Sequence, residues 1–207
     1  MKTFPKALLF DLGGVLVQSR GLQLLLSVTE DRELQGDLPK ARRKWEETRA
    51  VGEFERGRLS VAGFCDAFMQ EWCIGMPQKE FIALFASFVG GFFPGAQDLL
   101  AQMKSMPVSV SCLSNTNVLH WMKLQADVNI DRYFAHTLLS FEIGARKPEE
   151  AIYAYAIDVL GREPGDIAFF DDALPNIEAA SRLGMRAFHV CGPAEVQDVL
   201  KSKLGFC

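Results

Sequence analysis

The stretch that decides the fold is Ala7-Leu8-Leu9-Phe10-Asp11-Leu12-Gly13-Gly14-Val15-Leu16-Val17. Its apolar start predicts a buried strand, which ends at Asp11 and leads into a turn with two glycines. A carboxylate at the carboxyl end of a strand lies where α/β folds bind ligands. Glycines let backbone N–H groups approach an anion closely. The stretch therefore indicates an anion site at a strand end, or else a turn that Asp11 only caps.

Strand and helix patterns alternate along most of the chain. Strands are predicted at 7–10, 108–113, 137–140, 167–170 and 187–190, and helices at 95–105, 118–126, 148–160, 174–183 and 194–203. This alternation predicts an α/β fold with a doubly wound parallel sheet. Because right-handed crossovers place all strand carboxyl ends at one edge, Asp11, Ser114 and the Asp171-Asp172 pair are expected to meet there.

The segment from about Gln18 to Gly90 breaks the alternation, because it holds no strand pattern. Helices are predicted instead at 40–50, 60–72 and 78–88, with Ser60 as the N-cap of the second. We therefore expect a core domain of residues 1–17 and 90–207 and an α-helical cap domain of residues 18–89. Gly90-Gly91 and residues 18–21 are the expected hinges between them.

Composition excludes several classes of protein. A net charge of −4 without a basic stripe gives no electrostatic footprint for nucleic acid. No stretch approaches the roughly 18 apolar residues of a membrane span, and the first apolar run is too short for a secretory signal. Five cysteines without a CxxC pair predict reduced, mostly buried thiols in a cytoplasmic protein. No oligomeric state is predicted.

Three later segments form a set with the opening one: Cys112-Leu113-Ser114-Asn115-Thr116-Asn117, Gly144-Ala145-Arg146-Lys147-Pro148 and Phe169-Phe170-Asp171-Asp172. In this order the four resemble the four motifs of the haloacid dehalogenase-like (HAD) hydrolases, over almost the whole chain. The strongest resemblance is to the branch with bacterial α-glucose-1-phosphate phosphatases and the phosphatase domain of soluble epoxide hydrolase. A segment of the expected cap, Phe54-Glu55-Arg56-Gly57-Arg58-Leu59-Ser60, resembles a cap segment of that branch. The resemblance implies a Rossmann-like core with a C1-type helical cap.

The chemistry of phosphate-ester hydrolysis suits these residue types. A carboxylate nucleophile can form an acyl phosphate and so divide one difficult step into two. Because two anions must then approach each other, a divalent cation is required, and Mg²⁺ takes oxygen ligands. Asp11, Asp172 and the Gly13 carbonyl can supply such ligands, and Lys147 adds positive charge near the phosphate.

The resemblance implies a role for each motif residue. Asp11 corresponds to the nucleophile and a metal ligand, Asp172 to a direct metal ligand, and Asp171 to a residue that acts through a metal-bound water or orients the site. The implied catalytic residues are Asp11, Ser114 and Lys147. The implied substrate-binding residues are Leu12, Gly13, Ser114, Asn115 and Lys147, with Asn176 as a supporting residue.

One position departs from the family pattern. The family usually has a second Asp two residues after the nucleophile, as general acid and base, where this chain has Gly13. Such catalysis typically contributes about 10²–10⁴ in rate. Three explanations compete: an easily released leaving group such as an anomeric sugar oxygen or an acyl phosphate, a proton donor elsewhere, or lost turnover. A donor elsewhere would be water or a cap residue, with Glu53 and Glu55 considered first.

The sequence thus predicts a cytoplasmic, Mg²⁺-dependent phosphatase of a small phosphorylated metabolite, with a sugar phosphate as the expected substrate. The first alternative is a catalytically weak protein that binds phosphorylated ligands or regulates through them. The second is a dehalogenase of small haloacids, which would need no metal and would leave Asp171-Asp172 unexplained.

Overall fold

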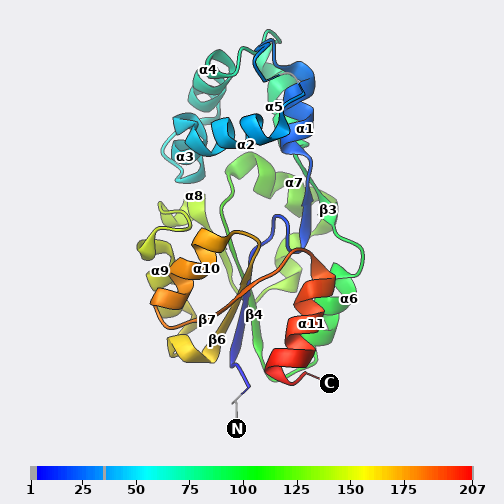
Figure 1. The fold of residues 1–207 in the computed structure, drawn as a ribbon, viewed down its shortest axis with the longest axis vertical. Coiled ribbons are helices and arrows are strands. Elements are labelled where there is room, and N and C mark those ends of the chain that lie inside the picture. The colour runs from blue at the N-terminus through cyan, green and yellow to red at the C-terminus, as the bar shows by residue number, and fades with distance from the viewer. Residues whose placement is uncertain (1–3, 35, 207) are drawn as a thin grey trace.

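A five-stranded parallel sheet lies at the centre of the protein in a computed structural model that describes residues 4–34 and 36–206 (Figure 1). The strand order is β5-β4-β1-β6-β7. The bounds are β1 (Ala7–Phe10), β4 (Ser109–Ser114), β5 (Thr137–Leu139), β6 (Ile167–Asp171) and β7 (Arg186–His189). The predicted doubly wound α/β fold is confirmed, and each predicted strand bound lies within about one residue of the observed one.

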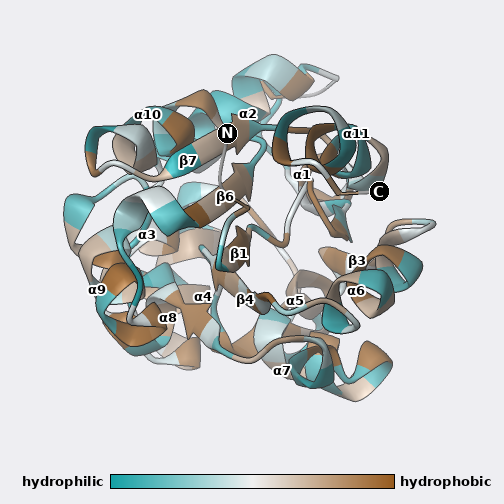
Figure 2. Ribbon diagram, turned by 90° about the horizontal axis from the view of Figure 1, so that it is seen from below, coloured by the Kyte–Doolittle hydropathy of each residue, from teal (hydrophilic) through white to brown (hydrophobic). Residues whose placement is uncertain are grey.

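Helices cover both faces of the sheet. One face packs against α6 (Ala96–Lys104), α7 (Val118–Val128) and α11 (Pro193–Leu204). The other packs against α9 (Glu150–Leu160) and α10 (Leu174–Arg182). In Figure 2 the apolar strands β1 and β6 lie between these layers. Alternate side chains of β1 enter the two hydrophobic clusters, which explains why this strand reads as a continuous apolar run.

Short elements complete the core. They are α8 (Ser140–Ile143), η1 (Ile130–Tyr133) and η2 (Pro164–Asp166). The strand predicted at 137–140 ends one residue earlier, and Ser140 is the first residue of α8. The Ser140 hydroxyl is hydrogen-bonded to the backbone of Thr116.

Helices from the first half of the chain form a separate group beyond the carboxyl ends of the strands (Figure 1). They are α1 (Gly21–Val28), α2 (Leu38–Glu47), α3 (Arg49–Glu55), α4 (Val61–Glu71) and α5 (Gln78–Ala86). Their hydrophobic cluster is distinct from the two clusters of the sheet and is built largely from aromatic side chains, including Phe64, Phe68 and Phe81. These features support our proposal that residues 18–89 form a cap on a core of residues 1–17 and 90–207.

Two helix predictions in the cap were incomplete. The helix predicted at 40–50 is interrupted at Thr48, whose ψ of 111° is extended and whose hydroxyl accepts a hydrogen bond from the buried Trp72 indole. Helix α1 was not predicted; it begins at Gly21, a poor helix former, and has no side-chain N-cap. Ser60 does cap α4, as expected, by accepting from the Gly63 N–H.

The expectation that no strand lies between Gln18 and Gly90 was wrong. The two segments that link cap and core pair as an antiparallel two-stranded sheet of β2 (Val17–Ser19) and β3 (Val89–Phe92). The glycines of β3 give little strand signal in the sequence. The two expected hinges therefore run side by side and are hydrogen-bonded to each other.

The cysteines differ from the prediction in their exposure. Cys65, Cys73, Cys112 and Cys191 are free thiols, as predicted, but Cys73 and Cys191 are exposed, so the thiols are not mostly buried. Cys207 lies outside the described residues.

Within residues 4–34 and 36–206, no helix is both long and apolar enough to cross a membrane.

Candidate active site

The four motifs meet at the carboxyl edge of the sheet. Asp11 follows β1, Ser114 ends β4 and Asp171 ends β6. The Asp11 N–H donates to the Phe170 carbonyl over 2.8 Å, which ties the first motif to the fourth. The parallel topology has therefore brought together residues that lie more than a hundred positions apart in the chain, as the sequence predicted.

The two glycines of the turn after Asp11 differ in backbone conformation and in the space around them. Gly14 has a φ of +74°, and a Cβ there would lie 2.3 Å from Oδ2 of Asp172, so the position requires glycine. Gly13 has open space around its missing side chain and a φ that any residue adopts. The N–H of Gly14 donates to the Val17 carbonyl, so it closes the turn and does not face an anion.

Lys147 holds the centre of the site. Its Nζ lies 2.7 Å from Oδ1 of Asp11 and 2.6 Å from Oδ2 of Asp171, and the whole residue is buried. Burial opposes the charged form of Lys147, but the two carboxylates outweigh it and raise its pKa. Burial also raises the pKa of Asp11; Lys147 opposes that rise and Asp171 adds to it. The ammonium group therefore stays charged and stabilises the Asp11 carboxylate.

The two acids of the fourth motif have different surroundings. Asp171 is fully buried, and besides Lys147 it accepts hydrogen bonds from the Ala173 N–H and the Asn176 amide, each over 2.9 Å. Asp172 instead lines the cavity described below. Asn176 is placed where the resemblance implied a supporting residue, since it fixes the Asp171 carboxylate.

Carboxylate oxygens of Asp11, Asp171 and Asp172 lie within 4.8 Å of one another. Lys147 forms ion pairs with Asp11 and Asp171, and within residues 4–34 and 36–206 no other cation forms an ion pair with the three carboxylates. An all-oxygen donor set with surplus negative charge fits Mg²⁺. Because Asp171 already accepts three hydrogen bonds, Asp11 and Asp172 are the carboxylates best placed to bind the ion.

Asn115 joins the second motif to the third. Its side-chain amide donates to the Lys147 carbonyl over 2.9 Å, and its Oδ1 accepts from the Lys147 N–H over 2.8 Å. The sequence suggested only its backbone N–H as a phosphate ligand.

Ser140 was not predicted as a site residue. Its hydroxyl bridges the N–H and carbonyl of Thr116, and so shapes the same loop.

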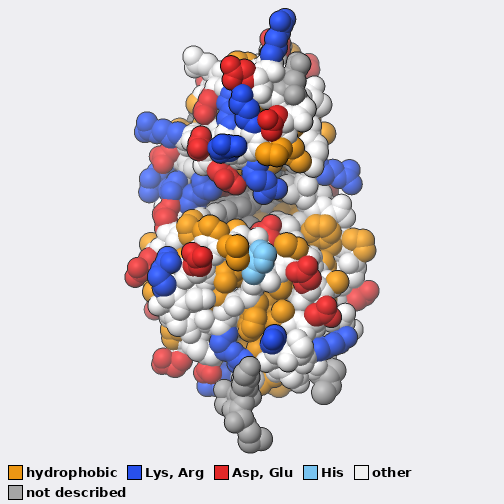
Figure 3. Space-filling view, viewed as in Figure 1, with side chains coloured by type: hydrophobic (Ala, Val, Ile, Leu, Met, Phe, Trp, Pro, Cys, Tyr) orange, Lys and Arg blue, Asp and Glu red, His pale blue; other side chains and the backbone are white. Residues whose placement is uncertain are grey.

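A cavity of about 420 Å³ opens above these residues. Figure 3 shows the hollow between the cap and the core, with Lys and Arg side chains along its cap side. Leu12, Gly13, Ser114, Asn115 and Asp172 line its core end. The cap contributes the remaining wall, including Leu22, Leu38, Arg42, Trp45, Glu46 and Glu55.

His120 also lines the cavity, but its ring is held in the protein interior. It is hydrogen-bonded to the Phe85 carbonyl and to the Asn117 side chain, and it stacks on the Phe85 ring. Burial lowers the pKa of His120 to about 4. The neutral imidazole therefore joins α7 to the cap.

A family model described as haloacid dehalogenase-like hydrolase matches residues 5–184. The chain belongs to this family. The motifs, the parallel sheet and the site at its carboxyl edge agree with the match, which confirms the resemblance to HAD hydrolases and makes the protein a hydrolase by family. The narrower resemblance to the α-glucose-1-phosphate phosphatase branch stays a prediction.

Several individual proteins are similar to this member of the family. The HAD family enzyme bt-2542 of Bacteroides thetaiotaomicron, in a complex with magnesium and inorganic phosphate, is 26% identical with a TM-score of 0.75, over 89% of this chain and 93% of that one. The sesquiterpene phosphatase astK of Aspergillus oryzae is 29% identical over 92% of each protein. Acyl-CoA dehydrogenase family member 10 of Mus musculus is 25% identical over 97% of this chain, which spans 19% of that protein.

Proposed function

We propose that the protein is a Mg²⁺-dependent phosphatase that hydrolyses a small phosphorylated metabolite through an aspartyl phosphate on Asp11. One observation carries the proposal: the Lys147 ammonium bridges Asp11 and Asp171, with Asp172 beside them at the core end of the cavity. This constellation offers a nucleophile, a fixed positive charge and an oxygen site for a divalent ion in one place.

Each residue then has a task in the reaction. Lys147 favours the ionised form of Asp11 against the burial that raises its pKa to about 7, and the ionised oxygen attacks the phosphorus atom. Asp171 acts as a positioning residue, because it holds the Lys147 ammonium and the turn that carries Asp172. Ser114 and the Asn115 N–H hold the phosphoryl oxygens. Asp11, Asp172 and the Gly13 carbonyl would hold Mg²⁺, which would supply charge to neutralise the two anions.

The relatives support this assignment at the level of reaction class. The bt-2542 structure contains magnesium and inorganic phosphate, and the Aspergillus relative is named a phosphatase. A sugar phosphate remains our predicted substrate. Because Trp45 and Leu38 bring apolar surface into the cavity, the substrate panel should also include phosphates of apolar alcohols.

Metal-dependent turnover of p-nitrophenyl phosphate tests the proposal. We expect the wild-type protein to release p-nitrophenol with Mg²⁺ and to stop when the metal is chelated, and Asp11→Asn to be inactive with an unchanged melting temperature. A protein that binds phosphate but shows no turnover would favour the alternative of a phospho-ligand binding protein, which Gly13 suggests. Halide release from a haloacid without metal would favour a dehalogenase.

A further inference from the structure

The open space at Gly13 leaves the proposed reaction without a proton donor on the first motif. Departure of an alkoxide needs a proton, and the attacking water in the second step must lose one. A donor must lie in the cavity, since the phosphate and the leaving group bind there. Its side chain must also be able to carry a proton near neutral pH.

Glu55, the last residue of α3, lies in the required place. Its side chain lines the cavity that Gly13, Ser114 and Asp172 also line, and the residue is only 8% exposed. The other candidate, Glu53, pairs with Arg56 and Arg58 and is not among the residues that line the cavity in the described part of the chain. The structure therefore favours Glu55 over Glu53 as the proton donor, a choice that the sequence did not allow.

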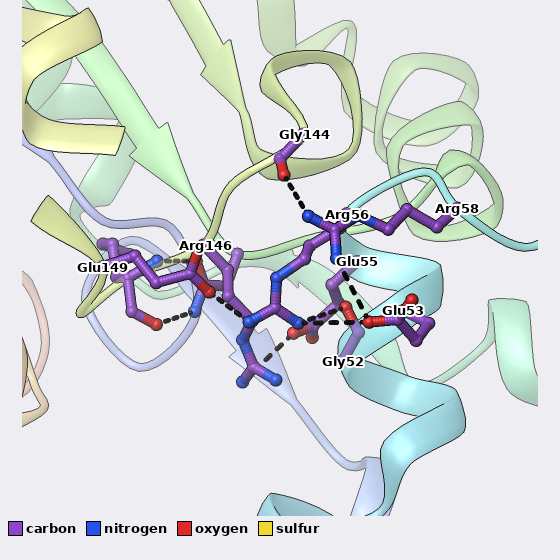
Figure 4. A network of polar contacts seen from close by, with 10 residues as sticks. Gly52, Glu53, Glu55, Arg56, Arg58, Gly144, Arg146 and Glu149 are labelled. Carbon is purple, nitrogen blue, oxygen red and sulfur yellow. Dashed lines mark hydrogen bonds and ion pairs between the residues drawn. The ribbon is translucent and has the colours of Figure 1, made fainter. Parts of the chain in front are cut away.

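A network of ion pairs and hydrogen bonds connects α3 to the residues around the third motif, as Figure 4 shows. Arg56 pairs with Glu149 and donates to the Gly52 carbonyl, and Arg58 donates to the Gly144 carbonyl. Glu149 and Gly144 flank Lys147 in the chain. The network thus connects the position of Glu55 in the cap to the segment that carries the catalytic lysine.

The Glu55 carboxyl is incompletely compensated. Its Oε2 lies 3.2 Å from Nη2 of Arg146, yet this buried oxygen accepts no hydrogen bond from the residues of 4–34 and 36–206. Burial raises the pKa of Glu55, while Arg146, Arg56 and Lys147 oppose that rise. A bound phosphate dianion in the same cavity would raise this pKa further, because like charges disfavour the ionised form.

We propose that Glu55 is the general acid and base of the hydrolysis, in place of the side chain that Gly13 lacks; this inference rests on the proposed phosphatase function. As Asp11 forms its bond to phosphorus, the bond from phosphorus to the leaving oxygen breaks, and the Glu55 proton passes to that oxygen to give the free alcohol. The Glu55 carboxylate then takes a proton from water as the water attacks the aspartyl phosphate. Inorganic phosphate leaves, Asp11 is regenerated and Glu55 is protonated again.

Substrates with good and poor leaving groups test this role in the full-length protein with Mg²⁺. We compare p-nitrophenyl phosphate, which needs little protonation, with glycerol 3-phosphate, which needs much. Glu55→Gln keeps the shape of the side chain but cannot give up a proton. We expect it to lower kcat/KM, which reports phosphoryl transfer to Asp11, about 10²-fold or more for glycerol 3-phosphate and less than about tenfold for p-nitrophenyl phosphate. Because both substrates share the hydrolysis of the aspartyl phosphate, kcat should fall for both.

Controls separate this role from a structural one. Glu53→Gln removes an acid from the same network and should change kcat for both substrates less than about twofold. In the wild type, kcat/KM for glycerol 3-phosphate should fall at alkaline pH as Glu55 deprotonates, and Glu55→Gln should lack this fall. Gly13→Asp added to Glu55→Gln should restore part of the alkyl-phosphate activity, because the turn has room for the side chain.

Equal losses of kcat/KM on both substrates, or a wild-type alkaline limb of kcat/KM that survives in Glu55→Gln, would overturn the role of Glu55. Failure of the wild type to hydrolyse p-nitrophenyl phosphate with metal is a different result, because it would overturn the phosphatase proposal itself.

Discussion

Asn115 and Lys147 are joined by two hydrogen bonds that run in opposite directions, from the Asn115 amide to the Lys147 carbonyl and from the Lys147 N–H to Oδ1 of Asn115. The side chain thereby replaces a pair of backbone hydrogen bonds between the second and third motifs. Because the Lys147 ammonium must reach both Asp11 and Asp171, the backbone of Lys147 has little freedom to shift.

Asn115→Ala should therefore harm both stability and catalysis. It leaves the N–H and carbonyl of Lys147 without these partners, which costs about 1–3 kcal/mol for a buried polar group. We expect a lower free energy of unfolding and a kcat reduced at least about tenfold. Urea denaturation and steady-state kinetics measure the two effects, and unchanged kcat would show that Lys147 is positioned without Asn115.

Removal of Asp171 should mainly lower the stability of the fold, whereas removal of Asp172 should mainly weaken Mg²⁺ binding. Asp171→Ala leaves the buried Lys147 with one fewer carboxylate and should destabilise the fold by about 3–5 kcal/mol. Asp172→Ala should leave the melting temperature nearly unchanged and raise the Mg²⁺ concentration needed for half-maximal activity. Melting curves and metal titrations of both variants measure these effects. A destabilised Asp172→Ala together with a stable Asp171→Ala that needs more Mg²⁺ would contradict the roles that we assign to the two acids.

Gly14 and Gly13 form a matched pair for mutation. At Gly14 the φ of +74° and the closeness of a Cβ to Asp172 should make Gly14→Ala destabilising by about 1–2 kcal/mol and harmful to Mg²⁺ dependence. At Gly13 nothing opposes a Cβ, so Gly13→Ala serves as the control and should keep the wild-type melting temperature. Equal behaviour of the two variants in thermal melts and metal titrations would refute this difference.

His120 should make stability depend on pH. Its pKa in the folded protein, about 4, is below the ordinary value of 6.5, so the unfolded chain takes up a proton first as the pH falls. The contribution of His120 is present above pH 6.5 and is lost toward pH 4, which amounts to about 2 kcal/mol at pH 5. Urea denaturation at pH 8 and pH 5 should show a smaller loss for His120→Gln than for the wild type. The same loss in both proteins would mean that His120 takes up its proton equally in the folded state.

The core could be predicted well from the sequence because it follows local rules. The apolar strands that end at Asp11, Ser114 and Asp171 are buried on both faces, and such strands are recognisable one at a time. Parallel topology then places their ends together without further information. This is why the convergence of the first, second and fourth motifs follows from the strand pattern of the sequence.

Features that depend on contacts between distant segments were missed. The pairing of β2 with β3 brings together two ends of the cap, and Thr48 breaks a helix where it meets the Trp72 indole. The side-chain bond of Asn115 to Lys147 and the burial of Glu55 also join segments that are far apart in the chain. Neither periodicity nor spacing carries a signal for such pairs, so Glu55 could be named with Glu53 but not chosen over it.

The central claim is that Asp11 carries the phosphoryl group during turnover. The most direct measurement is a single turnover with p-nitrophenyl phosphate and Mg²⁺, stopped by acid and followed by mass spectrometry of the peptides. Our account predicts one phosphoryl group on the peptide that contains Asp11, formed at the rate of p-nitrophenol release and absent in Asp11→Asn. Turnover without phosphoryl transfer to that peptide, or activity retained by Asp11→Asn, would contradict it.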